Sequence, residues 1–299
     1  MKIELVPYFT FQKIRARTLV WCSLLSLFLS SAIYTEINTI SYNNETYNLP
    51  GGIYSILFYS VFILIISSIL FRSRLSYRNL FGGHPAWLTL ARYSILTIPL
   101  VSFSIAIIII QYHIGMALVP EFTEWLFEDN LETYVSPVNK KLLIANIISI
   151  FNLTIITPIF EEFFFRGILL TRWSIKWNTS KAIFVSSILF GILHSDIIGK
   201  ILFGYVLAIL YIKTRSLYVP ICIHIINNTI AIILQYYSEI ALNTSLELDN
   251  IPTKTQIWFW IIVLIIVIGI LFNFLRKNIP NKEWIVPYLI NHGHENNLN

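Results

Sequence analysis

The sequence predicts an all-α fold: a polytopic membrane helix bundle of about eight transmembrane helices, with both termini in the cytoplasm. Of the 299 residues, 56% are hydrophobic and only 12% are charged. One soluble core of this size would not need so many apolar side chains, so the bilayer is the expected solvent. Several segments also reach the roughly 17–25 apolar residues that a helix needs to cross the hydrocarbon layer. Among them are 51–70, 93–118 and 257–274.

Apolar segments and the charged loops between them divide the chain into eight predicted spans. They are 18–34, 51–70, 93–118, 150–172, 182–198, 201–212, 218–236 and 257–274. The span at 201–212 is too short to cross unaided, so it must be tilted, extended at its ends or buried among its neighbours. Lys140–Ser149 is either an interfacial helix or the start of a long fourth span. We expect one integral-membrane domain, 1–299, with a polar C-terminal tail at 278–299.

Positive charge alternates between the loops. Thr35–Pro50 contains no Lys or Arg, and Pro120–Asn139 contains several acidic residues, whereas most of the 21 Lys and Arg lie in the other loops and near both ends. The positive-inside rule makes the basic side cytoplasmic. The net charge of +5 is therefore a topology signal. We expect the lipid bilayer as a partner and no nucleic acid.

The fourth span contains TPIFEEFFFRG, which places two glutamates and an arginine near the middle of the bilayer. An ionisable side chain there costs about 2.5–3.5 kcal/mol, so it usually faces the bundle interior and has a function. Glu162 and Arg166 are four residues apart and share a helix face, where they can neutralise each other. Glu161 is rotated by about 100° and lacks that partner, which suits a general base or acid. A purely structural ion-pair cluster is the alternative.

Two later spans add polar side chains at membrane depth. In FGILH, Phe190 and His194 are four residues apart, and in HIINN the same spacing joins His224 to Asn228. Each pair therefore shares one helix face. A Glu and a His can activate a water, and a neutral His with an Asn amide can donate hydrogen bonds to a developing oxyanion. This combination of side chains on three helices indicates peptide hydrolysis.

The blocks EEFFFRG, FGILH and HIINN resemble in type, order and spacing the motifs EExxxR, FxxxH and HxxxN of the CPBP family. This family comprises the CAAX proteases and bacteriocin-processing proteins and is also called the Abi family. The resemblance covers about 155–230. It implies an eight-helix intramembrane glutamic endopeptidase, a hydrolase whose catalytic core lies at 142–236.

The resemblance also implies the roles of individual residues. Glu161 and His194 would activate the attacking water, and His224 and Asn228 would stabilise the oxyanion. Structural support would come from Glu162, Arg166 and Phe190. Counted from the cytoplasmic starts of their spans, His194 lies about 18 Å deep and His224 about 9 Å deep. The two rings can meet only if their helices are tilted or offset.

The family resemblance leaves metal dependence open, because members are described both as metalloproteases and as metal-free glutamate proteases. Glu161, His194 and His224 could supply the three protein ligands of a catalytic zinc, but the chain has no HExxH helix. We expect no cofactor, with zinc as the alternative, because Glu and His suffice to activate water and Asn is a poor zinc ligand. Neither cysteine has metal-site or disulfide spacing.

Other functions remain possible for the same residues. A transporter would be favoured by charges along one continuous path or by repeated halves, whereas these lie in three compact blocks. A bacteriocin self-immunity or peptide-binding membrane protein could use the same cavity without cutting. The expected partner is a membrane-associated peptide or protein of bacteriocin, signalling or CAAX type. Frequent Ile and Asn are typical of an AT-rich bacterial genome, which favours a multi-pass protein of the bacterial cell membrane.

Overall fold

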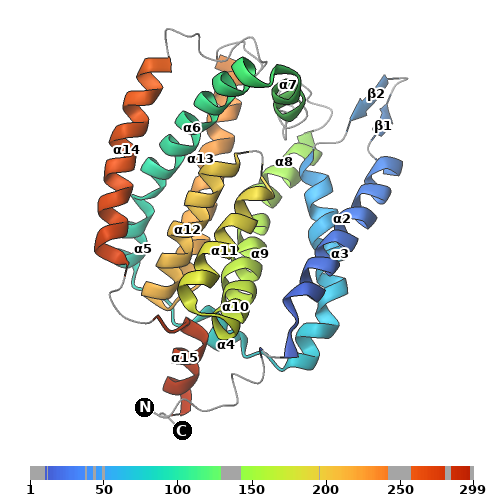
Figure 1. Ribbon diagram of the computed structural model, residues 1–299. Helices are drawn as coiled ribbons and strands as arrows, with labels where there is room; N and C mark the ends of the chain where they lie inside the picture. The colour runs from blue at the N-terminus through green and yellow to red at the C-terminus, as the bar shows by residue number, and fades with distance from the viewer. Residues whose placement is uncertain are drawn as a thin grey trace.

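The computed structural model describes residues 11, 13–37, 39–42, 45–48, 51–128, 143–194, 196–241, 257–279 and 284–296. It confirms the all-α membrane bundle (Figure 1). Within these ranges, seven helical segments are long and apolar enough to cross a membrane. They are Ala16–Ile37, Ile53–Ser73, Trp87–Leu118, Ile144–Lys176, Ile197–Thr214, Tyr218–Gln235 and Ile257–Asn278. The protein is therefore a multi-pass membrane protein.

Several elements form the first half of the bundle. They are α2 (Ala16–Ile37), β1 (Thr39–Tyr42), β2 (Glu45–Asn48), α3 (Gly51–Ser73), α4 (Tyr77–Phe81), α5 (Trp87–Ser94), α6 (Thr97–Leu118) and α7 (Pro120–Glu128). The strands pair antiparallel, with Thr39 opposite Asn48. This hairpin lies in the segment between the first two spans, which the sequence analysis treated only as a loop.

The long fourth span bends through two π-helical segments. It consists of α8 (Leu143–Phe151), η2 (Asn152–Ile156), α9 (Thr157–Glu162), η3 (Phe163–Leu170) and α10 (Thr171–Lys176). Leu143–Phe151 is thus the start of this span rather than a separate interfacial helix. Pro158 in α9 has no backbone N–H to donate to the preceding turn, which is the π-helical segment η2. π-helical turns are frequent at functional sites, and here they flank the two glutamates.

The remaining helices are α11 (Thr179–Ile192), α12 (Ile197–Thr214), α13 (Tyr218–Ala241), α14 (Ile257–Asn278) and α15 (Pro287–Asn296). The predicted fifth span, 182–198, was too long, because α11 has only 14 residues. The predicted sixth span is extended at both ends to 18 residues in α12, which is also the most enclosed span. In the view of Figure 1, the facing ends of α11 and α12 lie lower than the upper ends of α6 and α14.

Described residues near the two ends of the chain meet at one end of the bundle. The rings of Phe11 and Tyr288 are 4.8 Å apart. Part of the segment predicted as a polar tail is helix α15, which packs on α4. Asn291 Nδ2 donates a hydrogen bond to the carbonyl of Asn79 at 2.9 Å. The cytoplasmic location of this end stays a prediction from the charge pattern.

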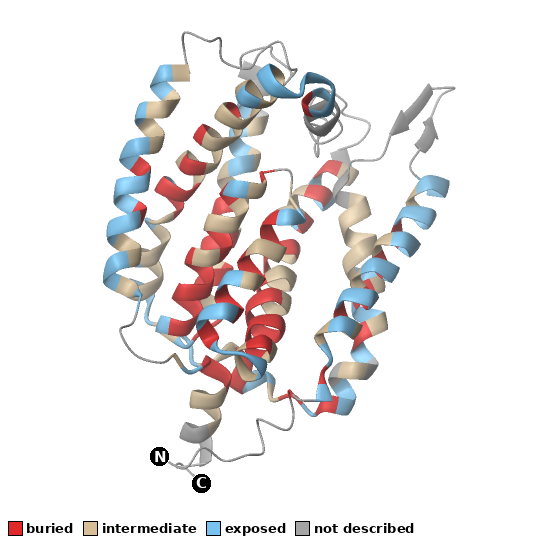
Figure 2. Ribbon diagram, viewed as in Figure 1, coloured by how far each residue is buried: buried red, intermediate tan, exposed pale blue. Residues whose placement is uncertain are grey.

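Buried residues concentrate on the central helices α9 to α12 (Figure 2). In contrast, α2 and α14 expose large apolar side chains on their outer faces, among them Trp21, Phe28, Ile265 and Phe272. Such faces match a hydrocarbon solvent. The polar residues of the three motifs therefore lie behind an apolar outer layer.

Candidate active site

Glu162 and Arg166 form a buried ion pair in the centre of the bundle. Arg166 Nη1 lies 2.7 Å from Glu162 Oε1, and both side chains are at least 98% shielded. Arg166 Nη2 also donates to the carbonyl of Gly204 on α12 at 3.3 Å. A Cβ at Gly204 would lie 3.2 Å from this nitrogen, so the glycine permits the close approach. The pair therefore joins the fourth span to α12.

Glu161 points away from this pair. Its Oε1 accepts a hydrogen bond from the Tyr59 hydroxyl of α3 at 2.7 Å. Its Oε2 lies 3.7 Å from His224 Nε2 and 3.9 Å from His194 Nε2. Both distances are too long for a direct hydrogen bond, and within the described residues Oε2 has no hydrogen-bond partner. Polar atoms at this separation are commonly bridged by a water.

The two histidines are oriented by their Nδ1 atoms. His194 Nδ1 lies 2.7 Å from the Phe190 carbonyl, which can only accept, so this nitrogen carries the proton. His224 Nδ1 lies 2.8 Å from Glu162 Oε1, the same oxygen that accepts from Arg166. In the neutral rings both Nε2 atoms are therefore acceptors. Together with Glu161 Oε2, they form three converging acceptor atoms, which a hydrogen-bond donor such as water could satisfy.

The offset of α11 explains why two histidines of different predicted depth converge. His194 follows the end of this short helix, inside the bundle, and α13 brings His224 to the same level. The Phe190 ring lies between them, with centroids 4.6 Å from His194 and 6.0 Å from His224. The Arg166 guanidinium stacks over the same ring at 4.5 Å. Phe190 thus packs against both histidines and the arginine of the ion pair.

Asn228 lies one helical turn beyond His224 on α13. Its Nδ2 donates to the Leu153 carbonyl of η2 at 3.0 Å, and its Oδ1 accepts from Asn227 Nδ2 at 3.3 Å. These contacts fix the amide orientation and use one of its two N–H groups. The second N–H can serve a ligand.

Sequence reasoning missed two polar residues that the structure brings to the site. Tyr59 bonds directly to Glu161 across 102 positions of the chain. Lys200 on α12 interacts electrostatically with Glu161 and both histidines, and its Nζ lies 5.2 Å from the Phe203 ring. As an intramembrane cation, Lys200 could have been found by the rule that singled out Glu161. Tyr59 had no such signal, because α3 carries no motif.

Zinc would need a tighter arrangement than the one observed. Ligand atoms about 2.0–2.1 Å from a tetrahedral zinc lie about 3.3 Å from one another, shorter than the Glu161–histidine separations of 3.7 and 3.9 Å. In the described part of the chain, no three His, Cys, Asp or Glu side chains are placed to hold a metal ion. Glu161, His194 and His224 do not fit the ion in this geometry, so no step below passes through it.

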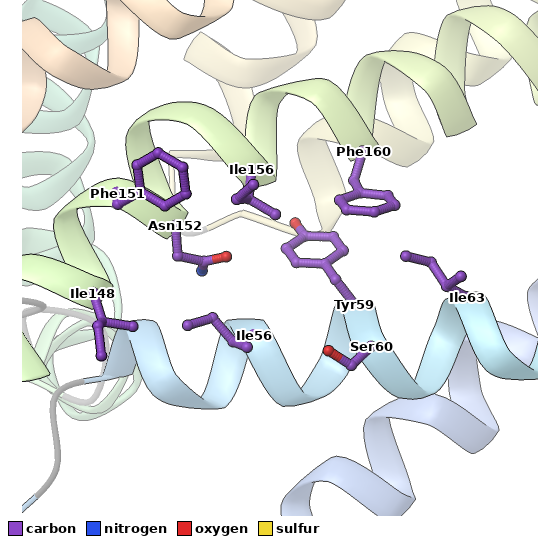
Figure 3. A pocket seen from close by; sticks show the side chains of 9 residues that line it. All are labelled: Ile56, Tyr59, Ser60, Ile63, Ile148, Phe151, Asn152, Ile156 and Phe160. Atoms are coloured by element: carbon purple, nitrogen blue, oxygen red, sulfur yellow. The ribbon is translucent and has the colours of Figure 1, made fainter.

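An apolar cavity borders the site between α3 and the start of the fourth span (Figure 3). Its volume is about 210 Å³. Tyr59 extends across it from α3, and its ring stacks on Phe160 at 5.5 Å. Since the Tyr59 hydroxyl bonds to Glu161, this side chain is a shared wall of the cavity and the site. The other residues that line the cavity are Ile56, Ser60, Ile63, Ile148, Phe151, Asn152 and Ile156.

Comparisons with known proteins agree with the three motifs. The family described as type II CAAX prenyl endopeptidase Rce1-like matches residues 143–230. YdiL of Bacillus subtilis, a candidate membrane peptidase by its name, is 38% identical over 85 residues, which are 27% of this chain and 35% of YdiL. The membrane-embedded CAAX protease MroQ of Staphylococcus aureus is 34% identical over 128 residues, 39% of this chain and 52% of MroQ.

These similarities are partial in length, because the chain covers about a third of YdiL and about half of MroQ. No solved structure matches the chain significantly. The matched segment nevertheless contains Glu161, His194, His224 and Asn228. Residues 143–230 of the chain are therefore similar to the Rce1-like membrane proteases, which supports the CPBP family for this segment.

Proposed function

We propose that the protein is an intramembrane endopeptidase in which Glu161 and His194 activate a water for attack on a peptide bond. The observation that supports this most is that the Nε2 atoms of both histidines lie within 3.9 Å of Glu161 Oε2, so that three acceptor atoms converge. A water in this space can donate one proton to Glu161 and the other to His194 Nε2. Both groups then hold the water oxygen ready for attack.

The proposed reaction follows from these proton positions. Glu161 takes a proton as the water oxygen bonds to the carbonyl carbon, and the carbonyl electron pair moves to its oxygen. When the tetrahedral intermediate collapses, the C–N bond breaks. The proton held by Glu161 then passes to the leaving amine, which restores the carboxylate.

We propose that Asn228 and His224 stabilise the oxyanion. Asn228 can donate its second N–H, whereas neutral His224 has its proton on Nδ1 and none on Nε2. His224 can donate from Nε2 only when doubly protonated. This refines the sequence expectation of a neutral His donor.

The proposed substrate is a membrane-associated peptide or protein, of bacteriocin, signalling or CAAX type. The site lies among membrane-spanning helices, and the adjoining cavity has mainly apolar walls, which suits a hydrophobic segment. The most informative experiment compares the peptides in membranes that contain wild-type protein or the Glu161→Gln variant. Peptides that appear only with wild type would support proteolysis and identify the substrate. Identical peptide profiles with a retained immunity phenotype would favour peptide binding without cleavage.

We expect a tight metal chelator to leave the cleavage rate unchanged, because the proposed steps use only Glu161, histidine and amide groups. The measurement is the initial cleavage rate of the purified protein before and after chelation and dialysis. The control is re-addition of zinc. Loss of activity on chelation and its return with zinc would overturn the metal-free mechanism.

We expect Tyr59→Phe to lower kcat about tenfold with little change in KM. The substitution keeps the ring on Phe160 and removes only the hydroxyl that orients Glu161. A lost hydrogen bond to a charged group costs about 1.5–3 kcal/mol, and about 1.4 kcal/mol in the barrier is tenfold in rate. Ser60→Ala is the matched control, because Ser60 lines the same cavity and makes no hydrogen bond to Glu161 within the described contacts. Equal kcat in both variants would contradict a positioning role.

A further inference from the structure

A second cavity lies at the end of the bundle near α4 and α15, and none of its lining residues belongs to the three motifs. Its volume is about 280 Å³, and it is lined by residues of α5, α12 and α14 together with Leu96, which precedes α6. Three cations contribute to the lining: Arg92 from α5, Lys213 from α12 and Lys277 from α14. No acidic side chain is among the lining residues.

No described carboxylate neutralises these three cations. Among the described residues, no carboxylate lies within ion-pair distance of Arg92, Lys213 or Lys277. Lys213 Nζ donates to Asn278 Oδ1, which is a neutral acceptor and leaves two further N–H groups. Three like charges on separate helices around one cavity repel one another, and an anion between them would offset that repulsion.

Apolar residues of α14 also line the cavity, and this helix has an exposed apolar outer face. Ile270 lines the cavity and is 49% exposed, and the neighbouring Phe272 is 63% exposed. Figure 2 shows α14 as one of the most exposed helices of the bundle. A ligand in this cavity would therefore contact the three cations and also the apolar, bilayer-facing surface of α14.

We propose that this cavity binds an anionic phospholipid, with its phosphate on Arg92, Lys213 and Lys277 and an acyl chain along Ile270 and Phe274. Charge complementarity selects an anionic headgroup, and the open apolar wall selects a lipid over a free ion. The charge pattern of the sequence predicts this end of the bundle to be cytoplasmic, where anionic lipid attracts basic residues. The bound lipid would hold α14 against α6 and α12. This proposal does not depend on peptidase activity.

The test uses the full-length protein in phosphatidylcholine nanodiscs with and without phosphatidylglycerol. Thermal unfolding and native mass spectrometry report stability and bound lipid. We expect phosphatidylglycerol to raise Tm by about 5 °C at saturation and to stay bound in mass spectra. The combined Arg92→Gln, Lys213→Gln and Lys277→Gln variant should lose about 10²-fold in lipid affinity, since each cation contributes about fivefold.

A variant with the same charge change separates the cavity from general surface charge. It combines Arg72→Gln, Lys176→Gln and Lys181→Gln, three exposed cations that the charge pattern predicts on the same side and that do not line the cavity. This control should keep the wild-type response. Equal loss in both variants, an unchanged Tm when phosphatidylglycerol is added to phosphatidylcholine nanodiscs, or an equal Tm rise with inorganic phosphate would overturn the proposal.

Discussion

The Glu161→Gln protein is expected to fold like wild type and to cleave its peptide substrate about 10²–10⁴-fold more slowly. Glutamine keeps the size of the side chain, and its amide oxygen can still accept the bond from Tyr59. The amide nitrogen can neither take a proton from water nor return one to the leaving amine. The loss should therefore fall on kcat, with little change in substrate binding.

Single-turnover cleavage by purified protein measures this effect, and thermal unfolding checks the fold. Glu121→Gln on α7 is the matched control, because this glutamate is exposed and lies outside the site. It should retain the full rate. Substantial cleavage by Glu161→Gln protein would rule out Glu161 as the general base.

Arg166→Met is expected to cause the largest loss of stability, about 3–5 kcal/mol. It leaves the fully buried Glu162 without its counter-ion and leaves the Gly204 carbonyl without its donor. At about 2–4 °C per kcal/mol, Tm should fall by roughly 10 °C. Thermal unfolding in one detergent measures the shift. Lys176→Met, at an exposed cation of the same span, should have little effect.

A second substitution distinguishes an unpaired charge from lost packing. In Glu162→Leu with Arg166→Met, no buried charge of the pair remains, so stability should partly return. Cleavage should stay low, because His224 Nδ1 loses its acceptor and the ring loses its fixed orientation. A double variant no more stable than Arg166→Met would show that the ion pair is not the source of the effect.

Local and averaged properties of this protein could be predicted from its sequence. Hydrophobicity is averaged over about twenty residues in each span, so the membrane helices can be predicted without knowledge of their contacts. The four-residue spacing of Glu162 and Arg166 also needs only helix geometry, and the structure shows that pair with both side chains buried. Where the pattern was short or interrupted, as at 182–198, the helix boundaries were wrong.

The sequence by itself therefore determined the membrane location, the resemblance to the CPBP family and which residues share a helix face. Only the tertiary structure decided which faces meet: it placed Tyr59 on Glu161, turned His224 Nδ1 toward Glu162, and offset α11 so that His194 and His224 converge. The physical reason is that periodicity specifies the direction of a side chain relative to its own helix. The partner of that side chain depends on the packing of helices that are distant in the chain. The residue pattern of an apolar span does not specify which helices pack against it.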